Sequence, residues 1–222
     1  MDTNQLIQHL ARDARPVRPL RSVPVRLGTW LLFSLLFAGM GILVMGIRTD
    51  LHSQFKSAAF FVEGVLLGGF SLWAAADALR LSVPGSFSKA GSPWISSLAL
   101  VAWIFLLLYQ LRGDYAVQRE EALVVDHEFI CALGIFLISL APSIVLLRIV
   151  YRGFPMNPVT VGALAGAANA SFAAFGMQFI CTHDRPIHVL TWHFLPVVFS
   201  GAAGAFYSSW LFRRQSATSG QP

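Results

Sequence analysis

The chain has 222 residues, of which 55% are hydrophobic and only 12% are charged, and its mean hydropathy is +0.62. A soluble domain of this length usually carries about a quarter charged residues, so the composition indicates a large lipid-facing surface. The net charge of +5 does not indicate direct nucleic-acid binding, because the basic residues stand at the ends of apolar runs and in one amino-terminal segment.

The amino-terminal segment, residues 1–27, is polar and rich in arginine. Residues 2–14 have the apolar spacing of a short amphipathic helix, and Pro16 and Pro19 are expected to end it. So few apolar residues cannot form a core, and the helix must therefore lie on lipid, pack on the rest of the protein or dock into a partner protein. The candidate partner-binding residues are Leu6, Ile7, Leu10, Arg15 and Arg18.

Six apolar runs follow this segment. A membrane helix needs ~20 mostly apolar residues to cross a hydrocarbon core of ~30 Å. The runs that meet this requirement are residues 28–47, 58–79, 94–111, 129–147, 159–180 and 190–212. We expect the first run to be retained as a membrane helix, since it is not a cleavable signal peptide by position or length. The sequence predicts an all-α bundle of six transmembrane helices over residues 28–212, followed by a short tail of residues 213–222.

The distribution of basic residues predicts the orientation of this bundle. With the amino terminus in the cytoplasm, eleven of the 16 Lys and Arg residues fall in inner segments and five in outer ones. Short cytoplasmic loops carry an excess of Lys and Arg, so both termini are expected to be cytoplasmic.

Small residues and prolines mark several of the predicted spans. Rows of small residues at four-residue spacing occur in the fifth span and in the sixth, where the row is Gly201, Ala205 and Ser209. Such rows let helix backbones approach closely, and we favour tight packing over a substrate path as their role. Pro142 and Pro196 are expected to kink the fourth and sixth spans.

Both cysteines are predicted at the external face, where Cys131 begins the fourth span and Cys181 ends the fifth. Most of the histidines fall on the same side, and the candidate metal ligands among them are His127, His183, His188 and His193. Thiolate and imidazole suit soft or borderline metals such as Zn(II), Cu(I) or Cd(II). Two thiols on an oxidising face could instead form a disulfide or respond to an oxidant. The residues favour a sensing or binding site and leave these two alternatives open.

Two acidic residues lie within a predicted span, Glu63 and Asp77 in the second. Each is close to one end of the span, so a structural or interfacial role is expected. A small transporter or metal-uptake protein, the alternative function, would need ionisable groups near mid-membrane. A membrane thiol oxidoreductase would relay electrons between two pairs of thiols, and this chain has only two cysteines. We therefore expect no enzyme.

Short motifs distributed along the chain resemble the NrsF family of membrane-bound anti-sigma factors (negative regulators of sigma F). The motifs are residues 1–7, 15–20, 48–51 and 81–85, the pair Cys131 and Cys181, and Trp192-His193 at the start of the last span. The resemblance covers nearly the whole chain and includes the six-helix layout.

The resemblance implies a protein of the bacterial inner membrane that holds an extracytoplasmic-function sigma factor inactive. Residues 1–27 would be the sigma-binding element. The family associates its two cysteines, here Cys131 and Cys181, with sensing of heavy-metal or related stress from the periplasm. The expected partners are thus the sigma factor and the lipid bilayer, with the oligomeric state left open.

Overall fold

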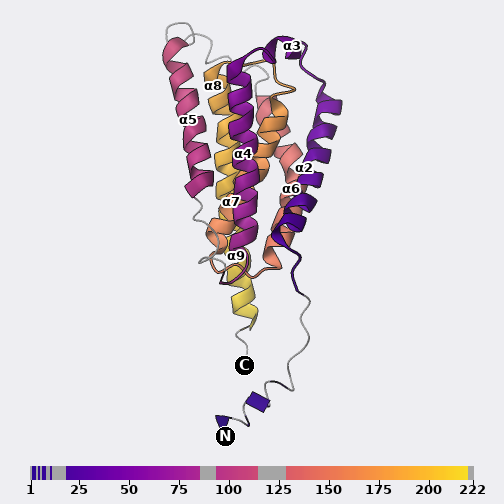
Figure 1. Cartoon of the computed structure of the whole chain (residues 1–222), viewed down its shortest axis with the longest axis vertical. Coiled ribbons are helices and arrows are strands. Elements are labelled where there is room, and N and C mark those ends of the chain that lie inside the picture. The colour runs from indigo at the N-terminus through magenta and orange to yellow at the C-terminus, as the bar shows by residue number, and fades with distance from the viewer. Residues whose placement is uncertain are drawn as a thin grey trace.

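The computed structural model describes residues 2, 3, 5, 7, 8, 11, 19–85, 94–114 and 129–219. Within these ranges every named element is a helix, which confirms the predicted all-α class (Figure 1). The elements are α2 (Val23–Met45), α3 (Leu51–Gln54), α4 (Ala58–Leu81), α5 (Trp94–Asp114), α6 (Phe129–Tyr151), α7 (Pro158–Met177), α8 (Pro186–His188), the π-helix η2 (Val189–Phe194) and α9 (Leu195–Ser219).

Five helices in the described ranges are long and apolar enough to cross a membrane: α2, α4, α6, α7 and the continuous helix Pro186–Arg214. The apolar part of α5 is shorter, Ser96–Arg112, so the sixth span stays a prediction. Helix α2 begins five residues before the predicted start of the first span, and a proline stands in its first turn. Proline is favoured there because its missing N–H would have had no helical partner.

Helix α7 is the centre of the bundle and contacts α2, α4, α6 and α9. Its residues are mostly glycine, alanine and serine, and most of them are buried. The side chain of Asn157 caps the helix by accepting a hydrogen bond of 3.1 Å from the Thr160 backbone N–H. Small side chains allow several helices to approach α7 at once, which explains its central position.

The closest packing joins α7 to α9. A Cβ atom added at Gly166 would collide with the carbonyl oxygen of Ser200, and one added at Gly204 would collide with the carbonyl oxygen of Gly162. The predicted small-residue row of α9 is therefore only partly right. Gly201 is buried against α7, but the row continues through Gly204 and Ser208 rather than through Ala205 and Ser209.

Polar side chains fasten α2 and α4 to the same helix. The indole Nε1 of Trp30 donates a hydrogen bond of 2.8 Å to Oδ1 of Asn169, and both residues are buried. The hydroxyl of Ser71 in α4 donates to the carbonyl of Ala168, and the hydroxyl of Ser171 in α7 donates to the carbonyl of Leu67. Hydrogen bonds of this kind between membrane helices add to van der Waals packing.

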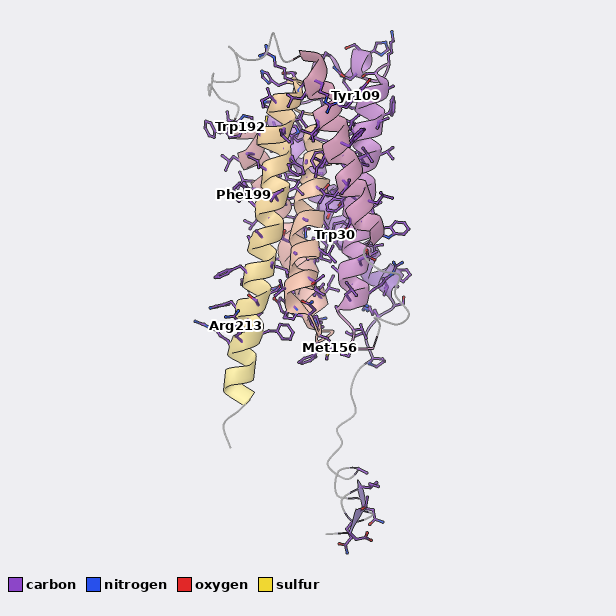
Figure 2. The ribbon with its side chains drawn as sticks, turned by 90° about the vertical axis from the view of Figure 1, so that its left-hand side faces the viewer. Trp30, Tyr109, Met156, Trp192, Phe199 and Arg213 are labelled. Atoms are coloured by element: carbon purple, nitrogen blue, oxygen red, sulfur yellow. The ribbon has the colours of Figure 1, made fainter. Side chains whose placement is uncertain are left out.

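The outer surface of the bundle is apolar along its length. Large side chains such as Leu43, Val44 and Phe206 are more than 70% exposed, and Figure 2 shows Phe199 pointing away from the helices. The start of α2 and the end of α9 lie at one end of the bundle, and α3 and α8 lie at the other (Figure 1). The surface and the helix lengths are those of a membrane protein.

The contact at Gly166 predicts a specific loss of stability. We expect Gly166→Ala to lower the free energy of unfolding by about 1–3 kcal/mol, because the new methyl group forces α7 and α9 apart. Gly39→Ala is the matched control, since a Cβ there meets nothing within 4 Å. Thermal unfolding of both variants in detergent, followed by tryptophan fluorescence, makes the comparison. Equal stability of the two variants would contradict the packing described.

Candidate functional site

Four side chains of types that bind metals in many proteins lie together at the end of the bundle that carries α3 and α8. Cys131 lies in the first turn of α6, Cys181 follows α7, His188 ends α8 and His193 lies in η2. One ligand atom from each lies within 4.8 Å of the others. Cys181, His188 and His193 are at most 6% exposed, and Cys131 is half-buried. We call these four residues the Cys/His cluster.

The spacing within the Cys/His cluster suits a tetrahedral metal site. The two Sγ atoms are 3.5 Å apart and are not joined in a disulfide, and Sγ of Cys181 is 3.4 Å from Nε2 of His188. Ligand atoms around a tetrahedral zinc ion are about 3.3–3.8 Å apart, given metal–ligand distances of about 2.0–2.3 Å. Two sulfurs and two imidazole nitrogens are also the donors that Zn(II), Cd(II) and Cu(I) prefer. The residues therefore fit a metal of this class.

The π-helix η2 explains how two histidines five residues apart reach one site. In an α-helix of 3.6 residues per turn, His188 and His193 would be rotated by about 140° from each other. Hydrogen bonds in a π-helix join residues five apart, which turns such residues toward the same face of the helix. Pro196 lies just beyond η2 and supplies no N–H to the carbonyl four residues before it, so a wider turn costs little here.

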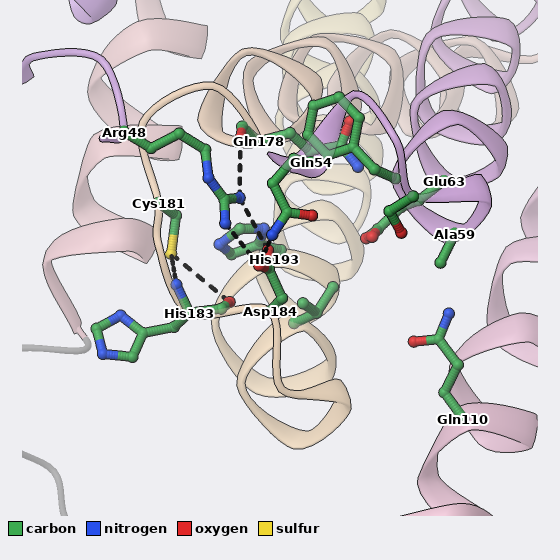
Figure 3. Close-up of a pocket in the computed structure, with 13 residues that line it drawn as sticks. Arg48, Gln54, Ala59, Glu63, Gln110, Gln178, Cys181, His183, Asp184 and His193 are labelled. Atoms are coloured by element: carbon green, nitrogen blue, oxygen red, sulfur yellow. Dashed lines mark hydrogen bonds and ion pairs between the residues drawn. The ribbon is translucent and has the colours of Figure 1, made fainter. Parts of the chain in front are cut away.

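The remaining predicted ligands are not part of this set. The backbone N–H of His183 donates to Sγ of Cys181 at 3.4 Å, while its imidazole stacks on that of His188. In Figure 3 this imidazole points away from Cys181. His183 therefore contacts Cys181 through its backbone and His188 through its ring but is not among the four grouped residues, and its role as a ligand stays a prediction. His127 lies outside the described residues.

The surroundings of Cys181 favour its thiolate. The pKa of Cys181 is lowered, first by the neighbouring thiol of Cys131 and then by the imidazole of His188, against the opposing effect of burial. A thiolate is the form that binds metals and attacks oxidants. Both ring nitrogens of His193 are buried and make no hydrogen bond within the described ranges. A bound ion would satisfy one of them.

An ion-pair network around the buried Arg48 holds the segment that carries Cys181. Arg48, which follows α2 and is 4% exposed, donates two hydrogen bonds to the carboxylate of Asp184, at 2.8 and 2.5 Å. It also donates to both carboxylate oxygens of Asp50, and its backbone N–H donates to the carbonyl of Phe179. The two carboxylates raise the pKa of Arg48, and Arg48 in turn lowers the pKa of Asp50. The network joins the end of α2 to the segment between α7 and α8.

A small polar cavity of about 70 Å³ lies beside the cluster (Figure 3). Its lining includes Arg48, Glu63, Gln178, Cys181 and His193. Glu63 accepts a hydrogen bond of 3.4 Å from the indole of Trp103. This volume holds a few water molecules and gives the buried sulfur and imidazole a polar neighbour.

The second acidic residue of α4 has a structural partner. Asp77 is 2% exposed, pairs with Arg80 at 3.3 Å and accepts a hydrogen bond from Ser96 of α5. This contact attaches α5 to α4 and agrees with the structural role expected for Asp77.

Four of the five candidate partner-binding residues lie outside the part of the chain that the structure describes. Leu6, Leu10, Arg15 and Arg18 lie outside the described residues, and Ile7 is 57% exposed. The role of these five residues stays a prediction.

The Arg48 network predicts the reactivity of Cys181. We expect Arg48→Gln to make Cys181 react about three to ten times faster with a maleimide. Loss of the ion pairs should lower the free energy of the local opening that exposes Cys181 by roughly 1 kcal/mol. Lys56→Gln is the control, since Lys56 is an exposed cation on the same end of the bundle. Peptide mass spectrometry assigns the modified cysteine. Unchanged reactivity in Arg48→Gln would show that the network does not hold this segment.

Comparison with known proteins gives one match. The model of the family described as NrsF, negative regulator of sigma F, matches residues 10–213. No curated protein and no solved structure matches the chain. The family match covers α2 to α8, α9 up to residue 213, and all four residues of the Cys/His cluster. The chain thus belongs to the NrsF family, whose members are described as negative regulators of a sigma factor.

Proposed function

We propose that this protein is an anti-sigma factor of the bacterial inner membrane that sequesters an extracytoplasmic-function sigma factor. It releases the sigma factor when a periplasmic metal ion or oxidant acts on Cys131 and Cys181. The family supports negative regulation of a sigma factor, and five apolar helices support a membrane location. The observation that carries the sensing role is the Cys/His cluster, which lies at the opposite end of the bundle from the start of α2.

The proposal includes six spans with both termini in the cytoplasm. In addition to the five long helices, α5 crosses the membrane, as the third span in chain order. The start of α2 and the end of α9 share one end of the bundle, as an even number of crossings requires. The excess of Lys and Arg at this end supports its cytoplasmic side. The Cys/His cluster is then periplasmic.

The sigma-binding element is the amino-terminal segment. Helix α2 begins at Val23, so the part that is free to bind a partner is shorter than residues 1–27. The amphipathic spacing of Leu6, Ile7 and Leu10, together with Arg15 and Arg18, suits a groove with an acidic rim on the sigma factor. This segment leads directly into α2.

A signal at the cluster changes contacts between helices. Coordination by Cys131, Cys181, His188 and His193 would join α6, the segment after α7, and η2 through one ion. Oxidation would instead join two of these elements. The two thiols lose two protons and two electrons to the oxidant, and their sulfurs move from 3.5 Å apart to about 2.05 Å in a disulfide.

Either signal has a physical route to α2. The segment that carries Cys181 is bonded to Arg48, and Arg48 follows α2 directly. A ligand shifts a conformational equilibrium only by its difference in affinity between two states. Here that difference arises if the four residues of the cluster lie closer together in the state that releases the sigma factor, because the signal then favours that state.

Removal of the amino-terminal segment tests the regulatory role. We expect the full-length protein in detergent to retain the sigma factor encoded nearest to it, and a chain lacking residues 1–18 to lose this binding. The deletion stops before α2 so that Trp30 and the rest of that helix stay in place. A melting temperature equal to that of the full-length protein is the control for folding. Failure of the folded full-length protein to bind would contradict the proposed function.

Metal affinity tests the sensing site. We expect His193→Gln to weaken Zn(II) or Cd(II) binding by more than about 100-fold, since even residues that only orient a metal ligand contribute up to that factor. His52→Gln is the matched control, because His52 is an exposed histidine of α3 at the same end of the bundle and is not part of the cluster, so this variant should keep the native affinity. Competition with a chelator of known affinity measures both. Equal effects of the two substitutions would argue against the four-ligand set.

A further inference from the structure

A second cavity lies at the opposite end of the bundle from the Cys/His cluster. Its volume is about 730 Å³, and it lies between the first residues of α2 and the segment that follows α6. Three arginines line it, Arg21, Arg26 and Arg152, and none of the described residues in its lining is an Asp or Glu. Cavities that hold small ligands have volumes of about 300–1,000 Å³, so this one has room for a complete polar group.

Arg26 is the most informative of these residues, because its charge is buried and no described carboxylate pairs with it. It is 7% exposed, and its guanidinium donates to the hydroxyl of Ser82 and to the carbonyl of Leu79, both at 3.3 Å. Its Nε is buried and makes no hydrogen bond, and no carboxylate in the described ranges pairs with this side chain. A buried cation held only by neutral acceptors is costly, and an anion beside it would offset that cost.

The other two arginines add positive charge on the open side of the same cavity. Arg21 and Arg152 are exposed, and within the described part of the chain neither is paired with a carboxylate. A guanidinium presents two parallel N–H groups that match two oxygens of a phosphate. Three such groups around one cavity therefore favour a phosphate group as the ligand.

The remainder of the lining is apolar and points to an amphiphile. Leu20, Ile149 and Phe154 line the cavity beside the arginines, and Leu20 and Phe154 are 40% and 68% exposed. The cavity also lies where two membrane helices end, which is the level of lipid headgroups. Basic pockets between membrane helices at this level bind anionic headgroups. A soluble phosphate compound or an acidic protein segment would not use the apolar side.

The turn after α6 fixes one wall of the cavity. Gly153 lies so close to the backbone carbonyl of Ser82 that a Cβ atom would collide with it. Phe154 follows with a φ of 58°, a region that bulky residues rarely adopt. Ser82 is also the acceptor for Arg26, so this turn and the buried arginine are held by the same residue.

We propose that this cavity binds the phosphate headgroup of one anionic phospholipid, with Arg26, Arg21 and Arg152 as its ligands and the apolar residues beside its acyl chains. The bound lipid lies directly under the connection between the amino-terminal segment and α2. This proposal does not depend on the sigma factor or on metal sensing.

Native mass spectrometry of the full-length protein in detergent tests the proposal. The probes are phosphatidylglycerol, phosphatidylcholine with the same acyl chains, and glycerol 3-phosphate as the soluble phosphate. We expect one phosphatidylglycerol to be retained at least about tenfold more tightly than phosphatidylcholine, and glycerol 3-phosphate not to displace it. Arg21→Gln and Arg152→Gln should each weaken retention about tenfold. Both residues are exposed, so these variants should fold even if Arg26→Gln does not.

Arg148→Gln is the matched control, an exposed arginine one helical turn before Arg152 that does not line the cavity. It should leave phosphatidylglycerol retention unchanged. An equal loss in this control would mean that lipid binds diffusely to surface charge, which overturns the proposal. Displacement by glycerol 3-phosphate would assign the cavity to a soluble phosphate. Full retention of phosphatidylglycerol by Arg21→Gln and Arg152→Gln would also overturn the proposal.

Discussion

The bundle depends on the small volume of the side chains of α7. Lipid tails are as apolar as leucine, so burial of apolar surface gives membrane helices little reason to associate. Close contact must supply the stability, and α7 permits it on several sides at once. Glycines at 162 and 166 receive α9, Asn169 receives the indole of Trp30, and Ser171 reaches the backbone of α4. The same helix ends just before Cys181, and so its packing also determines where that thiol lies.

A buried arginine lies at each end of α2, and the two differ in the charge of their partners. The guanidinium of Arg48, after the last turn, donates to the carboxylates of Asp50 and Asp184 and to the carbonyl of Gln178, so its charge is compensated. Arg26, in the first turn, has only neutral acceptors in the described structure. The first arrangement is complete within the chain and fixes α2 to the segment that carries Cys181. The second is incomplete, and it lies beside the connection to the amino-terminal segment. Helix α2 thus connects the ion-paired Arg48 at one end with Arg26, which has only neutral partners in the described structure, at the other.

Much of the architecture can be read from hydropathy. The predicted runs agree with the helices to within a few residues, because a lipid-crossing helix must be both long and apolar. The grouping of Cys131 with Cys181 followed from counting spans, although fifty residues separate them. Nothing in the sequence distinguished His193 from His183, because the choice depends on a local change of helix type. The Arg48–Asp184 pair was also missed, since its partners are far apart in the chain and only the fold brings them together.

The helix Pro186–Arg214 contains one turn that is wider than its neighbours. A wide turn is equivalent to one extra residue inserted into an otherwise regular helix. If it moved along the helix by several residues, the part that it passed would rotate by about 100° while the rest kept its orientation. The rotation about the helix axis between the face that carries His188 and the face that packs on α7 is therefore not fixed. Natural variation could adjust the geometry of the histidines by relocating this extra residue, without altering a single contact between the glycines of α7 and α9.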